Sequence, residues 1–465
     1  MHMKRVVVIG GGPGGYVAAI RAAQLGADVT LVEKGELGGT CLNRGCIPTK
    51  VLLHTAELYS SVKGGKRIGL NAEGLSVDWK TLMDRKSSVV KQLTNGVKAL
   101  LSSNGVSIVQ GEGSFAAPQE VLVTKKDGTK ESLKGDAFVV ATGSAPVKLP
   151  LPGMDLEGVI TSDEALSLDE IPESIVIVGG GVIGMEFASV FSSLGSQVAV
   201  VEMLPEILPP MDSEMAAALK KIMERKGVRF HTSTTVTGIT REKDMLQVKA
   251  KAGEKELSLA GKKVLVAVGR KPYTAGLNLE DIGVKVERGR ITVNEQMETN
   301  VGGIYAIGDC ASPIMLAHVA MTEGATAAGN IMGEHKAMNY KVVPNCLYTS
   351  PELAGVGLTE EEAKKRAGEV KVGRFPLAAN GKALILGETQ GMVKIIADAK
   401  YGEILGLHIL GPKATELIAE GAMAMTLEAT LEEITSTIHA HPTVGEAIFE
   451  AALAADGISI HMPKR

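Results

Sequence analysis

The feature that most constrains the fold is an internal repeat, which relates residues 4–33 to residues 173–202. Each copy reads as an apolar strand, a glycine-rich turn, an amphipathic helix and a second apolar strand that ends in glutamate. Glycine accounts for 55 of 465 residues, so about one Gly-x-Gly-x-x-Gly spacing is expected by chance. Two copies in the same context are not expected by chance, and they predict two dinucleotide-binding units. The turn glycines are Gly10, Gly12 and Gly15 in the first copy and Gly179, Gly181 and Gly184 in the second.

Each turn has the residue types that a bound pyrophosphate needs. The first glycine permits a sharp turn, the second lets the backbone approach the phosphates, and the third lets the helix pack on the strand. The helix N-terminus adds free N–H groups and the positive end of its dipole. Glu33 and Glu202 end the second strands, and we expect each to accept hydrogen bonds from a ribose diol. Glu202 would also repel a 2′-phosphate, which favours NAD over NADP. The alternative is that the glycines serve only helix–strand packing.

The fold class that this pattern predicts is α/β, with two Rossmann-like domains and a C-terminal α+β domain. The strands 138–140 and 264–266 each end in a turn with a glycine and occupy equivalent places in the two halves. After about residue 341, the strands 393–396 and 404–409 precede helix-rich sequence. Residues 61–100 read as amphipathic helix. The expected domains are residues 1–145, 146–271 and 341–465, with a central segment, 272–340, that completes the first nucleotide site.

Composition excludes several other classes of protein. The formal net charge is −4, without the basic excess of a nucleic-acid binder. No run of 18 or more apolar residues suggests a membrane span. Residues 6–9 are apolar, but glycines follow at once, so the run reads as a buried strand rather than a signal peptide. Four cysteines are too few for a secreted disulfide scaffold, which favours a cytoplasmic location.

Cys41 and Cys46 form the only close cysteine pair in the sequence. In an ideal helix, residues five apart have Cα atoms roughly 8–9 Å apart, whereas a disulfide needs about 4.4–6.8 Å. A redox-active pair therefore predicts a distorted helix here, with Gly45 and Pro48 as the residues that could cause it. The alternatives are two inert thiols or half of a metal site, for which only His54 lies nearby. Cys310 and Cys346 are expected to be spectators.

A second candidate for chemistry is His441, which precedes Pro442. Proline suits the first position of a helix, so we expect His441 to project from a helix start. Glu446 would then lie about one turn in and could bond one ring nitrogen, which fixes the tautomer and stabilises the imidazolium. Such a His–Glu pair could also be purely structural, and for His439 a structural role is the expectation.

Longer motifs make the chain resemble the flavin-dependent pyridine nucleotide–disulfide oxidoreductases over essentially its whole length. Within this family it is most similar to the members that oxidise dihydrolipoyl groups. The similarity rests on the two glycine turns and on four further segments, which are GGTCLNRGCIPTK (38–50), TNVGGIYAIGD (299–309), YTSPE (348–352) and HAHPTVGE (439–446).

The resemblance implies cofactor sites. FAD would be bound by the first half and by the flavin-lining residues, which are Gly10, Gly12, Gly15, Glu33, Lys34, Gly39, Thr40, Cys41, Lys50, Gly113, Thr142, Gly143, Ser144, Asp309, Met315, Leu316, Ala317 and His318. Asp309 would hold the ribityl chain. NAD would be bound by Gly179, Gly181, Gly184, Glu186, Glu202, Val236 and Gly269.

The resemblance also implies roles and partners. Cys41 would exchange with the substrate, Cys46 would lie against the flavin, and Lys50 would sit beside it, paired with Glu186. His441, with Glu446, would be the base, serving the dithiol of the second subunit of a homodimer. The partners would be lipoyl domains of 2-oxo acid dehydrogenase or glycine cleavage complexes.

Related chemistries remain as alternatives. Glutathione-type reductases share the dithiol and the His–Glu pair but usually prefer NADP. A mercuric reductase or a large thioredoxin reductase would carry a further C-terminal redox pair, and no cysteine follows Cys346. A transhydrogenase or an NADH oxidase would not need the dithiol. A purely structural subunit of a multienzyme complex would not need the catalytic set.

Overall fold

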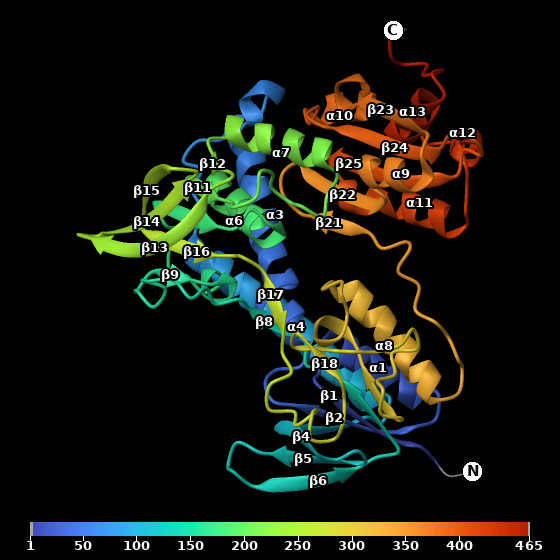
Figure 1. Cartoon of the computed structure of the whole chain (residues 1–465). Coiled ribbons are helices and arrows are strands. Elements are labelled where there is room, and N and C mark those ends of the chain that lie inside the picture. The colour runs from blue at the N-terminus through green and yellow to red at the C-terminus, as the bar shows by residue number, and fades with distance from the viewer. Residues whose placement is uncertain (1–2, 464–465) are drawn as a thin grey trace. The chain divides into compact units, whose positions relative to one another are not determined.

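The computed structural model describes residues 3–463 of the chain and divides it into two compact units (Figure 1). The first unit comprises residues 1–51, 80–148 and 269–339, and the second comprises 52–79, 149–268 and 340–465. Two helices, α3 (Cys46–Lys63) and α4 (Trp79–Ser103), carry residues of both units. Within the described residues, no helix combines the length and the apolar character needed to cross a membrane.

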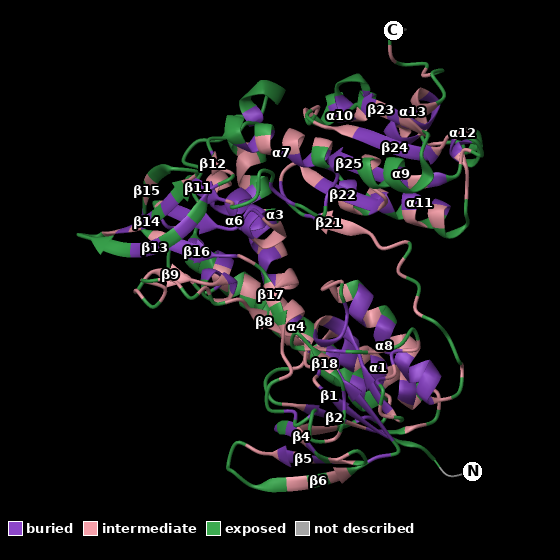
Figure 2. Cartoon of the chain, in the orientation of Figure 1, coloured by how far each residue is buried: buried purple, intermediate pink, exposed green. Residues whose placement is uncertain are grey.

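A five-stranded parallel sheet forms the core of the first unit, in the order β20-β7-β1-β2-β3. Helix α1 (Pro13–Gln24) packs against α8 (Ala317–Ile331), and a Cβ at Gly324 would lie only 2.4 Å from the Gly14 carbonyl oxygen. The central strands are buried (Figure 2) and continuously apolar, as expected of a parallel sheet covered on both faces. The strands are β1 (Arg5–Ile9), β2 (Asp28–Glu33), β3 (Ser107–Gln110), β7 (Ala137–Val140) and β20 (Ile304–Ala306).

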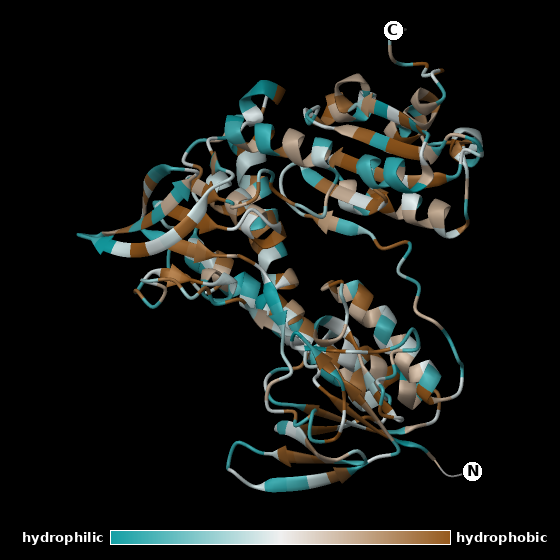
Figure 3. Cartoon of the chain, in the orientation of Figure 1, coloured by the Kyte–Doolittle hydropathy of each residue, from teal (hydrophilic) through white to brown (hydrophobic). Residues whose placement is uncertain are grey.

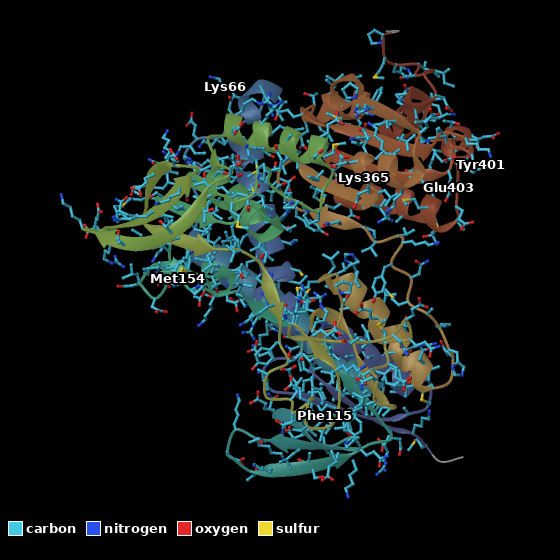
Figure 4. The ribbon with its side chains drawn as sticks, viewed as in Figure 1. Lys66, Phe115, Met154, Lys365, Tyr401 and Glu403 are labelled. Atoms are coloured by element: carbon cyan, nitrogen blue, oxygen red, sulfur yellow. The ribbon has the colours of Figure 1, made fainter. Side chains whose placement is uncertain are left out.

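Smaller elements complete this unit. Phe115, on the first strand of an antiparallel meander (Figure 4), packs its ring edge-on against Phe138 at 5.5 Å between centroids. The meander consists of β4 (Glu112–Ala117), β5 (Glu120–Thr124) and β6 (Lys130–Lys134). A two-stranded ribbon pairs β8 (Ser144–Pro146) with β17 (Arg270–Pro272), and a second pairs β18 (Val286–Glu287) with β19 (Arg290–Ile291). The remaining elements are α2 (Gly39–Arg44) and the 3₁₀ turn η2 (Gly308–Cys310).

The second unit contains another five-stranded parallel sheet, in the order β12-β11-β10-β16-β9. Its strands are β9 (Val159–Ile160), β10 (Ser174–Val178), β11 (Gln197–Val201), β12 (Arg229–His231) and β16 (Lys263–Val266). Its helices are α5 (Ser162–Ala165), α6 (Val182–Ser193) and α7 (Ser213–Arg225), and an antiparallel sheet adds β13 (Thr235–Glu242), β14 (Met245–Ala252) and β15 (Lys255–Gly261).

The C-terminal part of this unit is built on an antiparallel sheet in the order β21-β22-β25-β24-β23. Its inner strands are largely hydrophobic (Figure 3). The strands are β21 (Asn345–Leu347), β22 (Glu352–Gly357), β23 (Val370–Pro376), β24 (Met392–Asp398) and β25 (Ile404–Gly411). The helices are α9 (Glu360–Ala367), α10 (Gly381–Leu386), α11 (Ala414–Thr426), α12 (Leu431–Ser436) and α13 (Glu446–Ala455). The 3₁₀ turn η3 (Leu377–Ala379) precedes α10, and η1 (Gly65–Ile68) lies elsewhere in the unit. The strands expected over 393–396 and 404–409 are therefore confirmed as parts of β24 and β25.

A buried ion cluster joins α7 to this antiparallel sheet. The Lys394 side chain is only 2% exposed, and its Nζ lies 2.8–3.0 Å from carboxylate oxygens of Asp212, Glu214 and Glu360. Burial raises the pKa of Glu360, but hydrogen bonds from Lys364 and Lys394 outweigh burial and lower it to about 2. Asp212 is also the N-cap of α7, so the cluster fixes the start of that helix.

The expected continuous helix over residues 61–100 is wrong in its middle. Helix α3 ends at Lys63, η1 ends at Ile68, and α4 begins only at Trp79. Gly69 and Gly74, in the intervening segment, have φ of +84° and +64°. A helix cannot continue through this left-handed conformation.

Candidate active site

The first glycine turn can be made only with glycine at two of its positions. Gly10 has φ +106°, and a Cβ there would lie 2.4 Å from the Ala141 carbonyl oxygen. A Cβ at Gly15 would lie 1.8 Å from the Gly10 oxygen. Gly12 differs, because its ideal Cβ would meet only the Gly39 Cα, at 3.9 Å. Gly12 is also the N-cap of α1 and provides no side-chain cap, so the free N–H groups of the helix remain available to an anionic ligand.

The acid at the end of the second strand is held by the turn itself. In the first half, Glu33 accepts hydrogen bonds from the N–H groups of Gly11 and Gly35, both at 2.6 Å. In the second half, Glu202 accepts from Gly180 at 2.6 Å and from Leu204 at 2.8 Å. A carboxylate has about four acceptor positions, so each acid retains capacity for a ribose diol.

The dithiol segment is split between two helices. Cys41 lies in α2, Gly45 interrupts the helix, and Cys46 begins α3. A Cβ at Gly45 would lie 2.9 Å from the Thr40 oxygen, which is why glycine stands there. The predicted distortion is confirmed, and Gly45, with φ −145° and ψ −113°, is the residue at which the helix is interrupted. Pro48 lies inside the first turn of α3, where its missing N–H costs nothing.

Both members of the pair are thiols in this structure. A hydrogen bond with Cys46 raises the pKa of the Cys41 thiol, burial raises it further, and the positive charge of Lys50 acts in the opposite direction. Asn43, between the two cysteines, donates from its amide to the carbonyl oxygens of Leu37 and Gly39 at 3.0 and 2.9 Å. Sequence reasoning gave Asn43 no role, although it lies within the recognised motif.

The dithiol segment also lies directly against the first glycine turn. A Cβ at Gly39 would come within 2.7 Å of the Gly12 Cα. Gly39, the first residue of α2, has φ +56°. The first glycine turn and the cysteine-bearing helix α2 are therefore in direct contact in the first unit.

Four other predicted cofactor residues of the first unit make hydrogen bonds to one another or to Tyr273. The Ser144 hydroxyl donates to Asp309 at 2.5 Å, and the Thr142 hydroxyl donates to the Tyr273 carbonyl at 2.6 Å. Lys34 bonds the Tyr273 hydroxyl at 2.8 Å and lies 4.1 Å from its ring centroid. Gly143 has φ +71°. Gly113 lies in β4, whereas Met315 and Leu316 precede α8, and Ala317 and His318 begin it.

The residues predicted to contact the second nucleotide come from several segments of the chain. Gly179 has φ +112° and Gly269 has φ +111°. The Cβ of an alanine at Gly181 would meet nothing within 4 Å, whereas one at Gly184 would lie 2.1 Å from the Gly179 oxygen. Val236 is buried in β13, and buried Glu186 accepts the Tyr348 N–H at 3.2 Å. The pairing of Glu186 with Lys50 stays a prediction.

His441 and Glu446 are in contact, as expected, although the helix begins later than expected. The imidazole Nδ1 lies 2.9 Å from Glu446 Oε1, and Glu446 Oε2 accepts the Thr443 N–H at 2.8 Å. Helix α13 begins at Glu446 itself, so Pro442 lies in the preceding loop and its expected place as the first helical residue is wrong. The Glu446 carboxylate, in the first turn of α13, accepts the N–H of Thr443 in this loop.

The electrostatics of this pair suit a base held in one tautomer. Burial raises the pKa of Glu446, but hydrogen bonds from Thr443 and His441 outweigh it, so the net pKa is lowered and the acid stays ionised. An ionised Glu446 accepts from Nδ1, which leaves Nε2 as the lone-pair nitrogen. The His441 side chain is 79% exposed, so this nitrogen is accessible.

A second His–Glu pair, which the sequence did not reveal, lies one turn further along α13. His461 Nδ1 lies 2.7 Å from Glu450, which also accepts from the N–H groups of Ile460 and His461 and from the Ser459 hydroxyl. No spacing rule signals a contact between a helix and a tail beyond its end. His439 has a structural arrangement, with its ring nitrogens bonded to Glu420 and to the Thr437 carbonyl. Within residues 3–463, no cluster of His, Cys, Asp and Glu could hold a metal ion.

Two nucleotide-type turns, a dithiol against one of them and an oriented histidine define a class of enzyme. Such a chain is an oxidoreductase that couples a dithiol to a pyridine nucleotide. It belongs to the pyridine nucleotide-disulphide oxidoreductase family, whose model matches residues 4–324, and the dimerisation domain of that family matches residues 343–452. The family is FAD-dependent. The first glycine turn, where Gly39 lies against Gly12, and the uncapped start of α1 fit that cofactor.

Curated relatives and solved structures agree with this assignment. The chain is 46% identical over 465 residues to dihydrolipoyl dehydrogenase of Thermus scotoductus, with 99% of each chain covered. It is 43% identical over 458 residues to a dihydrolipoyl dehydrogenase of Bacillus subtilis, covering 98% and 99%. The structure of LpdA from Mycobacterium tuberculosis matches with TM-score 0.90 and 29% identity, over 97% of this chain and 99% of that one. The expected fold class and the resemblance to enzymes that oxidise dihydrolipoyl groups are therefore confirmed.

Proposed function

We propose that the protein oxidises protein-bound dihydrolipoyl groups to the cyclic disulfide and passes the electrons through Cys41, Cys46 and FAD to NAD⁺. The observation that carries this is the close approach of Gly39 to Gly12, which sets the dithiol helix against the turn that would bind the FAD pyrophosphate. Full-length similarity to dihydrolipoyl dehydrogenases supports the choice of substrate.

The chemistry divides between the chain and its cofactors. In the oxidised enzyme, a substrate thiolate attacks Cys41 of the Cys41–Cys46 disulfide, so that an S–S bond forms to substrate and Cys46 leaves as thiolate. The second substrate thiolate then displaces Cys41, so the substrate is oxidised by two electrons and the pair is reduced. Lys50 stabilises the thiolate charge. FAD, held by Gly10, Gly12, Gly15 and Asp309, would supply the redox chemistry that takes up these two electrons and delivers them as hydride to NAD⁺.

His441 supplies the base for this exchange. With Nδ1 bonded to Glu446, Nε2 takes a proton from the attacking substrate thiol. We place this histidine at the dithiol of the second subunit of a homodimer, because the C-terminal part of the chain matches a dimerisation domain. In this proposal Asp309 would hold the ribityl chain of FAD, and the predicted pair of Lys50 and Glu186 would lie beside its ring.

Selectivity and setting complete the proposal. Glu202, locked by two backbone N–H groups, favours NAD over NADP because it would repel a 2′-phosphate. The lipoyl domains of 2-oxo acid dehydrogenase or glycine cleavage complexes are the proposed partners. The small number of cysteines favours a cytoplasmic location. A glutathione-type reductase is the second candidate, since it would use the same dithiol and the same His–Glu pair.

The direct test is turnover of the purified protein with dihydrolipoamide and NAD⁺ or NADP⁺. NADH formation with NAD⁺ is expected, and Cys41→Ser should lower it at least ~10³-fold because the attacked sulfur is gone. Cys346→Ser is the matched control and should retain activity. Turnover of glutathione disulfide with NADPH, in place of this reaction, would reject the substrate.

A second measurement tests the base. His441→Gln should lower kcat by about 10²–10⁴-fold, because proton transfer from the substrate thiol is lost. His461→Gln is the control, since it removes a histidine held by the same kind of carboxylate on the same helix. Equal losses in the two variants would argue against His441 as the base.

A further inference from the structure

Arg270 makes two hydrogen bonds to one residue of the proposed FAD site. Its Nε donates to the Ser144 hydroxyl oxygen at 2.8 Å, and its Nη2 donates to the Ser144 carbonyl at 2.8 Å. The Ser144 hydroxyl in turn donates to Asp309 Oδ2 at 2.5 Å. These three half-buried side chains therefore form a continuous relay that ends on the carboxylate of Asp309.

The direction of this relay is fixed by the chemistry of its members. A guanidinium has only donors and stays charged, an ionised carboxylate has only acceptors, and a hydroxyl has one proton. Because Arg270 occupies the acceptor side of the Ser144 hydroxyl, the single O–H points at Asp309. Charge on both ends makes the two hydrogen bonds stronger than neutral ones. Asp309 is thereby linked to Arg270 through the Ser144 hydroxyl.

The backbone reinforces the same geometry. Arg270 begins β17 and Ser144 begins β8, and the two strands pair antiparallel in register 270–146 to 272–144. The Val147 N–H donates to the Gly269 carbonyl at 3.0 Å, and the Tyr273 N–H donates to the Gly143 carbonyl at 2.9 Å. The first unit ends one of its segments at Lys148 and begins the next at Gly269. The relay therefore lies where the chain leaves the FAD-type unit and returns to it.

We propose that Arg270 is a positioning residue for FAD, which acts through the Ser144 hydroxyl on the carboxylate that binds the ribityl chain. This inference rests on the proposed function, because it takes FAD as the ligand of Asp309. The competing explanation is a purely structural staple between β8 and β17, which would affect stability but not the Ser144–Asp309 bond.

The test compares FAD retention in full-length holoenzymes. The variants are Arg270→Gln, Ser144→Ala and the double variant, with Lys271→Gln as the control that removes a charge from the same strand on an exposed side chain. FAD release is followed by the rise in flavin fluorescence after dilution. We expect Arg270→Gln and Ser144→Ala each to accelerate release by about 10–100-fold, with the double variant no faster than the worse single variant and Lys271→Gln unchanged.

Two results would overturn the proposal. One is release from Arg270→Gln at the rate of Lys271→Gln. The other is multiplication of the two single effects in the double variant, since independent effects add in free energy. Arg270→Lys should recover less than half of the loss on a logarithmic scale, because an ammonium cannot bond the hydroxyl and the carbonyl in the same fork; full recovery would contradict the relay.

The experiment separates this inference from the proposed function. Should Arg270→Gln fold poorly, Arg270→Lys keeps the charge but loses the fork, and its rate of FAD release then tests the relay. If FAD release changes as expected but the wild-type protein does not oxidise dihydrolipoamide, the role of Arg270 is supported and the proposed substrate is rejected. If dihydrolipoamide is oxidised but FAD release does not change in the variants, only the role of Arg270 is rejected.

Discussion

The two glycine turns have almost the same local geometry in different surroundings. The first glycines have φ of +106° and +112°, and a Cβ at either would lie 2.4 Å from a carbonyl oxygen, that of Ala141 or of Ala267. The N-cap glycines, Gly12 and Gly181, have φ of −69° and −77°. In both turns the N–H of the glycine after the first donates at 2.6 Å to the acid that ends the second strand.

The two halves differ in the segment that comes after this acid. After Glu33 the chain enters α2, which brings Cys41 and sets Gly39 against Gly12. After Glu202 it reaches α7, whose cap, Asp212, joins the buried cluster around Lys394. Both turns have the geometry of a nucleotide-binding turn. Only in the first half does the segment that follows the acid place a dithiol next to the turn.

The largest expected effect comes from the third glycine of each turn. The Cβ of Gly15→Ala or Gly184→Ala would lie 1.8 or 2.1 Å from a carbonyl oxygen, at a cost of about 1–3 kcal/mol or more. We expect both variants to melt at lower temperature, with flavin lost in Gly15→Ala but retained in Gly184→Ala. Thermal unfolding and flavin absorbance measure this.

A control for these variants is available in α4. Gly96 is exposed in that helix, and its Cβ would meet nothing within 4 Å. Gly96→Ala should therefore stabilise the protein by up to about 1 kcal/mol. If Gly184→Ala melts at the wild-type temperature, the second turn tolerates a side chain at its third glycine. The packing around Gly184 would then be looser than the packing around Gly15.

The middle glycines should separate binding from stability. Gly12 and Gly181 have negative φ, and a methyl group would project into open space or only touch Gly39. Gly181→Ala should weaken NAD binding by roughly 10–100-fold with an unchanged melting temperature, because the methyl would occupy the place of the pyrophosphate. Gly12→Ala should do the same to FAD. Titration with each nucleotide distinguishes the halves, and unaltered NAD affinity in Gly181→Ala would remove the second turn from the proposed site.

The locked acids predict a smaller effect. In Glu202→Gln the new amide cannot accept from both the Gly180 and the Leu204 N–H groups. We expect NAD affinity to fall about tenfold, as for one or two lost charged hydrogen bonds, with FAD unaffected. Glu33→Gln is the mirror experiment, and an effect of Glu202→Gln on FAD would contradict the independence of the two halves.

The smallest effect concerns acid stability, which only the second half should show through its ion cluster. The pKa of Glu360 in the folded protein is about 2, below its ordinary value of 4.5, so its contribution is present above that ordinary value and is lost as pH falls toward 2. Glu360→Gln should lower the melting temperature at pH 7 and converge with wild type near pH 2. Glu361→Gln, whose partner Lys365 is exposed on α9 (Figure 4), should behave as wild type. If the melting temperature of Glu360→Gln is lower than that of wild type by the same amount at every pH, the effect is due to packing and not to charge.

Sequence predicted the features that depend on neighbours along the chain. The glycine turns, the break at Gly45 and the contact of His441 with Glu446 each lie within a few residues or within one repeat. The bonds from Arg270 to Ser144 and from Lys394 to Asp212 span 126 and 182 residues, and they depend on strand pairing that no local pattern encodes. The start of α13 differs from the expectation, because the preference of proline for the first helical turn does not require that a helix follows every proline.

The two hydrogen bonds that hold Glu202 limit how nucleotide preference could evolve in this half. The acid that would select the ribose also ties the turn to the end of its strand. A basic residue in place of Glu202, which could bind a 2′-phosphate, would leave the N–H groups of Gly180 and Leu204 without their acceptor. A change of preference from NAD to NADP would therefore need compensating substitutions in the turn, before or together with the replacement of Glu202. A single substitution at this position is not expected to be enough.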